Sequence, residues 1–88
     1  MESSKRLSPS PTELIDWLAA ENLLDLEWDF PENGDLAAAG LTPDVVAQMV
    51  IAIEEEYGVV LTKADLTPQN LASPLALAKL ISKHRVKN

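Results

Sequence analysis

Hydrophobic side chains recur at helical spacing in the middle of the chain and give its strongest helix signal. The apolar positions between Pro43 and Tyr57 fall every three or four residues, which places them on one wide face of a helix. They are Val45, Val46, Met49, Val50, Ile53 and Tyr57. Thr42 can cap this helix through its hydroxyl, Pro43 suits the first helical position, and Gly58 suits its end. The pattern therefore predicts a helix that begins after Thr42 and stops at Gly58.

Two further stretches predict shorter helices on either side. Ser10-Pro11-Thr12-Glu13 has the residue types of a capping box, so we expect a helix from there to about Asn22 or Leu24. Ser73-Pro74 repeats the cap-then-proline pattern and begins a last helix. The positions expected to face the core are Leu14, Trp17 and Leu18, bordered by Ile15, in the first helix and Leu77, Leu80 and Ile81 in the last.

The connection between the first two predicted helices is long. Residues 25–40 include Pro31 and an Asn33-Gly34 turn signal. A loop without apolar anchors would stay mobile, so we expect Trp28 and Phe30 to be anchors that lie over the core. A structured loop of this length is uncommon in a small domain unless it is functional.

The chain after the central helix alternates short segments. Val59-Val60-Leu61 is a brief apolar run with no second run to pair with, so we interpret it as an extended segment packed on the helices. A turn or a single helical turn is expected over residues 62–66. Thr67-Pro68 then repeats the cap-then-proline pattern at the start of another short turn. These elements together predict an all-α fold.

Length and composition limit the chain to one small domain. It has 88 residues, 47% of them hydrophobic, and no cysteine, which excludes disulfides. We expect a disordered tail at residues 1–9, a helical domain at 10–85 and a frayed end at 86–88. No apolar run approaches the length of a membrane span, and the first residues lack the apolar core of a secretory signal. A cytoplasmic protein is therefore expected.

The charges are strongly segregated. The net charge is −7, and no Lys or Arg occurs between Leu7 and Thr62. The acids in that interval are Glu13, Asp16, Glu21, Asp25, Glu27, Asp29, Glu32, Asp35, Asp44, Glu54, Glu55 and Glu56. Such a surface repels nucleic acid and anionic lipid and attracts basic protein surfaces. A purely solubilising role explains the same charges equally well.

Two motifs frame the central helix and carry a family resemblance. Gly40-Leu41-Thr42-Pro43-Asp44 begins the helix and Ile53-Glu54-Glu55-Glu56-Tyr57-Gly58 ends it, with Asp35-Leu36 upstream. At this spacing the chain resembles the acyl carrier proteins over residues 11–84. The resemblance implies a small four-helix bundle, with three main helices, a short third helix near Thr67-Pro68 and a long loop between the first two.

The resemblance fails at the residue that carries the family's chemistry. The serine that bears the phosphopantetheine arm falls on Pro43, which has no hydroxyl, and its neighbours fall on Thr42 and Asp44. No serine lies between Ser10 and Ser73, so no shift of the alignment restores the site. We therefore expect no cofactor. The alternative is a functional carrier whose 4'-phosphopantetheine is attached at an atypical position, with Thr42 the nearest hydroxyl.

The resemblance also implies a surface of the second helix that binds partner proteins. Family members dock on basic patches of enzymes through the second helix, and the matching positions are Asp44, Ala47, Gln48, Ile51, Glu54 and Glu55. Helical geometry independently places Asp44, Gln48, Ile51 and Glu55 opposite the core-facing side chains. Ile51 would then be an exposed aliphatic side chain framed by acids, although single exposed apolar residues are common.

Catalysis is not expected. With no cysteine and a single histidine, His84, the chain lacks the parts of a nucleophilic triad, and that histidine is interpreted as a residue of the surface or the edge of the core. A faint likeness of residues 29–40 to a calcium loop is discounted because Pro31 and Gly40 occupy ligand positions, so no metal is expected.

The leading hypothesis is a monomeric interaction module that docks on a basic acyl-processing or carrier-loading enzyme, in acyl, aminoacyl, fatty-acid or polyketide-type metabolism. An unrelated helical adaptor, and a bundle that shelters an acyl ligand beside Met49 without covalent attachment, also fit the sequence.

Overall fold

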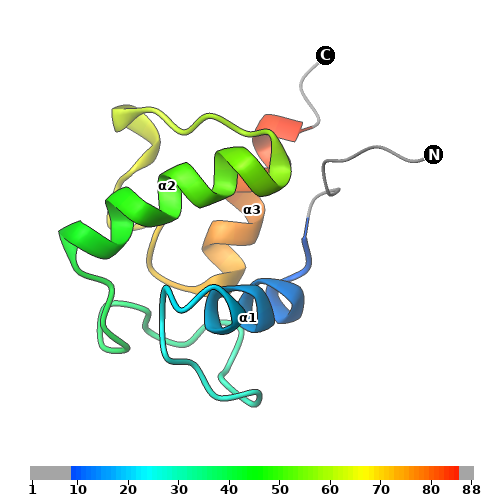
Figure 1. Cartoon of the computed structure of the whole chain (residues 1–88), viewed down its shortest axis with the longest axis vertical. Helices are drawn as coiled ribbons and strands as arrows, with labels where there is room; N and C mark the ends of the chain where they lie inside the picture. Colours follow the sequence, from blue (N-terminus) through cyan, green and yellow to red (C-terminus); the bar gives the residue numbers. More distant parts are fainter. Residues whose placement is uncertain (1–8, 86–88) are drawn as a thin grey trace.

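The computed structural model describes residues 9–85 and contains helices but no strand within that range (Figure 1). The elements are α1 (Pro11–Ala20), α2 (Pro43–Tyr57), the short 3₁₀ helix η1 (Lys63–Asp65) and α3 (Pro74–Arg85). The all-α prediction is therefore confirmed. Residues 1–8 and 86–88, which cover most of the two predicted tails, lie outside the described residues. Pro9, which we had placed in the first tail, is buried.

Each α-helix begins at the cap that its sequence predicts. In the capping box of α1, the Glu13 N–H donates to Ser10 Oγ at 3.1 Å and the Ser10 N–H donates to Glu13 Oε1 at 2.9 Å. The Val45 N–H donates to Thr42 Oγ1 at the start of α2, and Ser73 caps α3 in the same way. These bonds satisfy N–H groups that have no partner within the helix.

The end of α2 also follows its sequence. Gly58 adopts φ 72°, ψ 25°, and its N–H donates to the Glu54 carbonyl at 2.9 Å. This left-handed conformation is one that glycine reaches without the steric cost of a Cβ.

Two predicted elements differ from the structure. α1 ends at Ala20, earlier than Asn22 or Leu24, because the chain turns through Asn22 at φ 60° and brings Leu24 into the core. The short third helix expected near Thr67-Pro68 is a turn closed by a bond from the Leu71 N–H to the Thr67 carbonyl at 3.1 Å. The residues described thus hold three α-helices, and the one 3₁₀ helix among them lies earlier, at η1.

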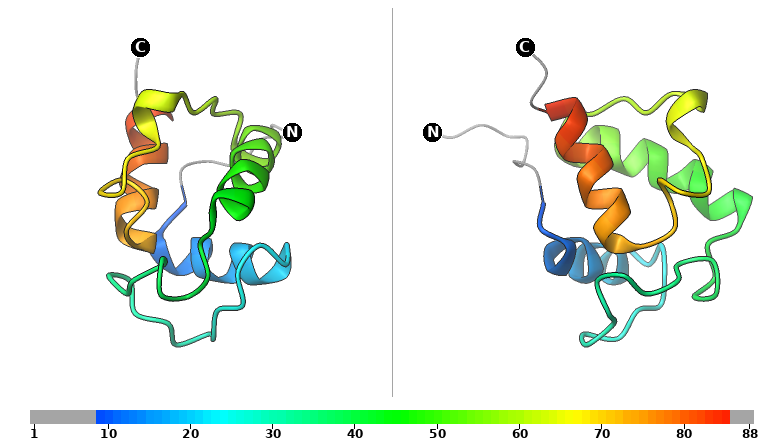
Figure 2. Two further views of the ribbon diagram at one scale, coloured as in Figure 1. Left: turned by 90° about the vertical axis from the view of Figure 1, so that its left-hand side faces the viewer. Right: turned by 180° about the vertical axis from the view of Figure 1, so that it is seen from behind.

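One hydrophobic core joins the three helices. α1 packs against α3 (Figure 2). It meets α2 where the Trp17 and Tyr57 rings form an edge-to-face pair with centroids 5.3 Å apart. Leu18, Met49 and Ile53 are fully buried between them. The other buried hydrophobic residues are Leu14, Ile15, Leu24, Leu26, Leu36, Val59, Leu61, Leu71, Leu77, Ala78, Leu80 and Ile81. Val59 and Leu61 face inward while Val60 is 61% exposed, as expected for an extended segment that packs through one side.

The connection between α1 and α2 runs around the end of the bundle farthest from η1 (Figures 1 and 2). Two backbone hydrogen bonds hold it to the first turn of α3 and to the segment just before that helix. The Leu36 N–H donates to the Ala72 carbonyl at 2.9 Å, and the Leu75 N–H donates to the Glu32 carbonyl at 2.8 Å. Leu36 is fully buried beside this pair of bonds. The connection is therefore fixed by backbone bonds as well as by side chains.

The expectation that Trp28 anchors the connection is wrong, because its side chain is 81% exposed. Phe30 packs against the core as expected, and Leu26 is buried. Between them the chain makes a tight turn in which the Phe30 N–H donates to the Glu27 carbonyl at 3.0 Å. Leu26 and Phe30 take the inward positions on each side of this turn, which leaves Trp28 directed outward.

The helices were also compared with the length and hydropathy of a membrane-spanning helix. Within the range that the structure describes, none of the helices is both long enough and apolar enough to traverse a lipid bilayer.

Candidate docking surface

The outward face of α2 carries every residue proposed from the sequence as a partner contact. All six are exposed, and Ile51 is 60% exposed: Asp44, Ala47, Gln48, Ile51, Glu54 and Glu55. Their spacing of three, four and seven residues places them in one stripe along the helix. Met49, Ile53 and Tyr57 hold the opposite side of α2 in the core. The six side chains therefore form one continuous exposed stripe along α2, the α2 stripe.

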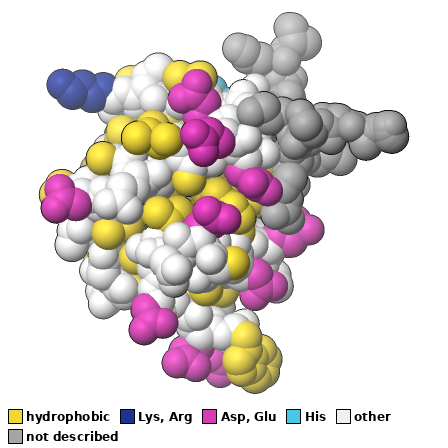
Figure 3. All heavy atoms as spheres, viewed as in Figure 1, with side chains coloured by type: hydrophobic (Ala, Val, Ile, Leu, Met, Phe, Trp, Pro, Cys, Tyr) yellow, Lys and Arg dark blue, Asp and Glu magenta, His cyan; other side chains and the backbone are white. Residues whose placement is uncertain are grey.

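Acidic and hydrophobic side chains are interspersed on the face of the molecule where α2 lies (Figure 3). Figure 3 looks onto the side of the molecule on which α2 lies in front. Acidic side chains are spread across this view between hydrophobic ones, and basic side chains are visible at one corner. A basic partner would meet both favourable charge and apolar contact here.

The start of α2 is built for helix stability. Thr42 has extended backbone angles, and its hydroxyl oxygen accepts the Val45 N–H at 3.3 Å. Pro43 occupies the first turn, and Asp44 places a negative charge beside the positive end of the helix dipole. The hydroxyl nearest to Pro43 is thus already a capping group. Esterification would reduce the ability of this oxygen to accept that hydrogen bond.

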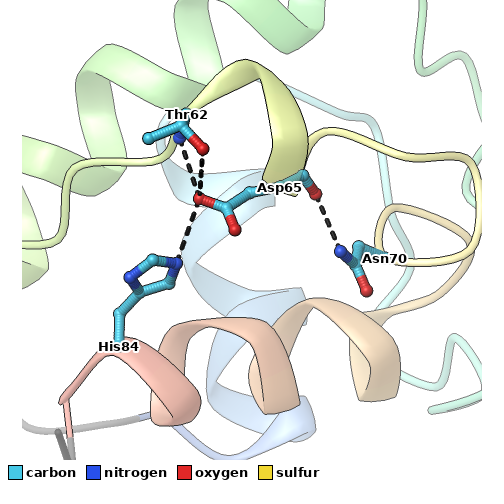
Figure 4. Close-up of polar contacts among 4 residues, drawn as sticks. All are labelled: Thr62, Asp65, Asn70 and His84. Atoms are coloured by element: carbon cyan, nitrogen blue, oxygen red, sulfur yellow. Dashed lines mark hydrogen bonds and ion pairs between the residues drawn. The ribbon is translucent and has the colours of Figure 1, made fainter.

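A polar cluster that sequence reasoning missed lies between η1 and α3 (Figure 4). His84 Nε2 is 3.1 Å from Asp65 Oδ2, and the same oxygen accepts the Thr62 N–H at 2.8 Å and the Thr62 hydroxyl at 3.0 Å. Asn70 Nδ2 donates to the Asp65 carbonyl at 2.9 Å. The spacing Thr-x-x-Asp could have indicated the bond within η1, but nothing local indicates His84, which lies far along the chain.

This cluster stabilises a charged carboxylate. The backbone hydrogen bond from Thr62 holds the pKa of Asp65 below its usual value, and His84 and the Thr62 hydroxyl lower that pKa further, while partial desolvation opposes them. The Thr62 hydroxyl bonds to the carboxylate and not to the imidazole, so the order of groups differs from that of a nucleophile–histidine–acid relay. The arrangement fastens η1 to the end of α3.

Two shallow depressions mark the surface of α1. The first, about 330 Å³, lies between α1 and α2 and is lined by Glu13, Asp16, Trp17, Ala20, Glu21 and Glu56. The second, about 310 Å³, follows the end of α1 and is lined by Ala19, Asn22, Leu23, Leu24 and Asp25. Met49, proposed as the wall of an acyl site, is fully buried and lines neither of them. No group of three or more His, Cys, Asp or Glu side chains suited to a metal ion occurs in the described part of the chain.

Comparison with known proteins returns no relative. The chain matches no protein-family model, no curated protein and no solved structure.

Proposed function

We propose that this protein is a non-covalent interaction module with the organisation of an acyl carrier protein, and that it docks on a basic partner through the outward face of α2. The observation that carries the proposal is Ile51, a 60% exposed aliphatic side chain that shares its stripe with Asp44, Glu54 and Glu55. The proposed partners are acyl-processing and carrier-loading enzymes that have a basic recognition patch.

Three features support an organisation like that of a carrier. They are the three α-helices of residues 9–85, the long ordered connection between the first two, and the Gly40 to Asp44 motif at the start of α2. The absence of a serine from this motif supports a role without covalent carriage. A functional carrier with phosphopantetheine on Thr42 is the second candidate, and its one supporting observation is that Thr42 is exposed at the right end of the helix.

The first test restores the motif of the family. The variant Thr42→Asp, Pro43→Ser, Asp44→Leu, and the unchanged protein, are each incubated with coenzyme A and a broad-specificity phosphopantetheinyl transferase, and intact mass is measured. We expect the variant to gain one phosphopantetheine and the unchanged protein to gain none. A gain by the unchanged protein, lost on Thr42→Val, would favour the second candidate. If the variant stays unloaded while a control carrier is loaded in the same tube, α2 is not presented as a carrier helix.

The second test uses the loadable variant to probe the stripe itself. Adding Glu54→Lys and Glu55→Lys should lower kcat/KM for loading on the order of tenfold at low salt and flatten its salt dependence, because reversed charges repel a basic enzyme during encounter. The matched control carries the same charge change on the connection, through Asp25→Lys and Glu32→Lys, both exposed. Equal effects in the two variants would mean that net charge alone steers the enzyme and that α2 has no special part.

A further inference from the structure

The turn formed by residues 27–30, named the Trp28 turn here, exposes a large aromatic side chain without an evident structural use. Trp28 is 81% exposed, more than any other large hydrophobic residue among those described. A tryptophan that only filled space would be expected in the interior, since burial of its ring is strongly favourable. We propose that the Trp28 turn is a second docking element, distinct from the α2 stripe, and that it binds an arginine-bearing basic protein segment.

The turn is fixed before any partner arrives. The hydrogen bond from the Phe30 N–H to the Glu27 carbonyl closes it at 3.0 Å, and Leu26 and Phe30 anchor its two sides on the core. Phe30 in turn covers Gly34, where a Cβ would lie 2.8 Å from the Phe30 ring, so a larger residue at position 34 would displace the ring. A second bond, from the Gly34 N–H to the Pro31 carbonyl at 3.0 Å, closes the adjoining turn. The indole is thus presented from an ordered support, which reduces the entropy lost on binding.

The surroundings of the indole select a cationic partner. Glu27 and Asp29 flank Trp28 directly. Asp25 precedes the turn and Glu32 follows it, and all four side chains are exposed. No Lys or Arg occurs anywhere from Ser8 to Leu61 to neutralise them. An arginine can stack on the indole face while its guanidinium donates to a carboxylate, and this combination favours Arg over Lys.

The same charges argue against other occupants. Exposed tryptophans also insert into membrane interfaces, but carboxylates on both sides of the ring repel anionic lipid headgroups. Nucleic acid would be repelled in the same way. The Trp28 turn lies on the connection, at the end of the bundle away from η1 (Figure 2). The role proposed for this turn does not depend on the role proposed for α2.

The test measures binding of a fluorescein-labelled, end-capped peptide of alternating Arg and Leu by anisotropy, with the full chain at about 0.15 M salt. We expect saturable binding that falls by about tenfold or more in Trp28→Ala, as for truncation of a buried aromatic anchor, and less in Trp28→Phe. Glu27→Lys with Asp29→Lys keeps the indole and should weaken binding to a similar extent. A peptide of alternating Glu and Leu should not bind.

Matched controls separate this site from nonspecific hydrophobic binding and from α2. Val60→Ser removes another exposed apolar side chain, outside both proposed surfaces, and should bind the Arg–Leu peptide as the unchanged protein does. Trp28→Ala should weaken binding by the same factor in the Ile51→Ser background, because the turn acts independently of the α2 stripe. Because Trp28 is mostly exposed, the variants should keep the helical circular dichroism of the unchanged protein, and the paired charge reversal supplies a second test if Trp28→Ala does not fold.

Four results would overturn the proposal. They are no saturable binding of the Arg–Leu peptide, binding unaffected by Trp28→Ala, a blue shift of Trp28 emission on vesicles that contain phosphatidylglycerol, or a concentration-dependent dimer abolished by Trp28→Ala. The last two would assign the turn to a membrane and to a second copy of this chain. Failure here leaves the loading experiments on α2 unaffected.

Discussion

At the scale of single residues, Asp65 joins three separate segments of the chain through its polar contacts. One carboxylate oxygen accepts two hydrogen bonds from Thr62 and faces His84, and the backbone carbonyl of Asp65 accepts from Asn70 (Figure 4). These partners join η1, the turn that follows it and the last turn of α3. The side chain of Asp65 is only 14% exposed, so water competes weakly for these bonds.

We expect this carboxylate to make the stability of the fold depend on pH in the acidic range. The folded protein lowers the pKa of Asp65 below its usual value of 3.8. The ionised carboxylate therefore stabilises the fold above pH 3.8, and this stabilisation is lost as the pH falls through the lower pKa of the folded state. Asp65→Asn should therefore be less stable than the unchanged protein at pH 7, and the difference should shrink below pH 4. Urea unfolding across this range measures it. Asp29→Asn, on the exposed connection, is the control, and a difference that persists at pH 2 would contradict the argument.

Residues whose role depends on near neighbours could be predicted from the sequence. The caps Ser10, Thr42 and Ser73 bond to N–H groups three residues away, and all three were predicted correctly. The prediction for Trp28 was wrong. The apolar indole ring favours burial, but the geometry of the turn around Trp28 directs the side chain outward. The contact of Asp65 with His84 joins two distant segments, and no local pattern encodes it.

At the scale of elements, the connection between α1 and α2 is ordered by Leu36 and not by Trp28. Leu36 is fully buried and begins a helical turn in which the Asp35 carboxylate accepts the Ala37 N–H at 3.0 Å. Gly40 ends this turn at φ 112°, a conformation that side chains with a Cβ rarely adopt. The exposed start of α2 is positioned by these contacts.

The two residues should therefore differ sharply in their effect on stability. Leu36→Ala should lower the free energy of unfolding by about 2–5 kcal/mol, because it leaves a cavity in the core. Trp28→Ala should change it by about 0.5 kcal/mol or less, as is usual at exposed positions. Thermal or urea unfolding followed by circular dichroism compares them. A larger loss for Trp28→Ala than for Leu36→Ala would mean that the indole is an anchor after all.

The bounds of the helices were predictable to different degrees. α2 runs between a cap-proline pair and a glycine, so local chemistry determines both of its ends, and both were predicted. α1 has a strong start but no such stop, and its end depends on how Leu24 reaches the core. The short helix expected at Thr67-Pro68 is a turn, although its cap forms as a bond from the Asn70 N–H to Thr67 Oγ1 at 3.1 Å. A cap thus begins a turn, and packing decides whether a helix continues from it.

At the scale of the whole molecule, the net charge of −7 is spread over a domain with a radius of gyration of 12.1 Å. The acidic side chains are visible over much of the face in Figure 3. Like charges at these distances repel one another, and folding brings them closer together. The stability of the fold should therefore be sensitive to ionic strength.

We expect the unfolding temperature to rise when NaCl is raised from about 0.01 to about 0.15 M, since the screening length falls from roughly 30 to roughly 8 Å over that range. Differential scanning calorimetry measures the slope. The double variant Asp44→Asn, Glu27→Gln removes two exposed charges and should reduce the slope of the unfolding temperature against salt concentration. An unfolding temperature that falls with added salt would show that attractive ion pairs outweigh the repulsion.

The two backbone hydrogen bonds that join the connection to the start of α3 and to the residues just before it also limit the order in which the fold can form during synthesis. Leu36 and Glu32 bond to Ala72 and Leu75, so neither bond can form on the ribosome until the later segment has left the exit tunnel. Most of the chain must therefore be synthesised before the support beneath the start of α2 is complete.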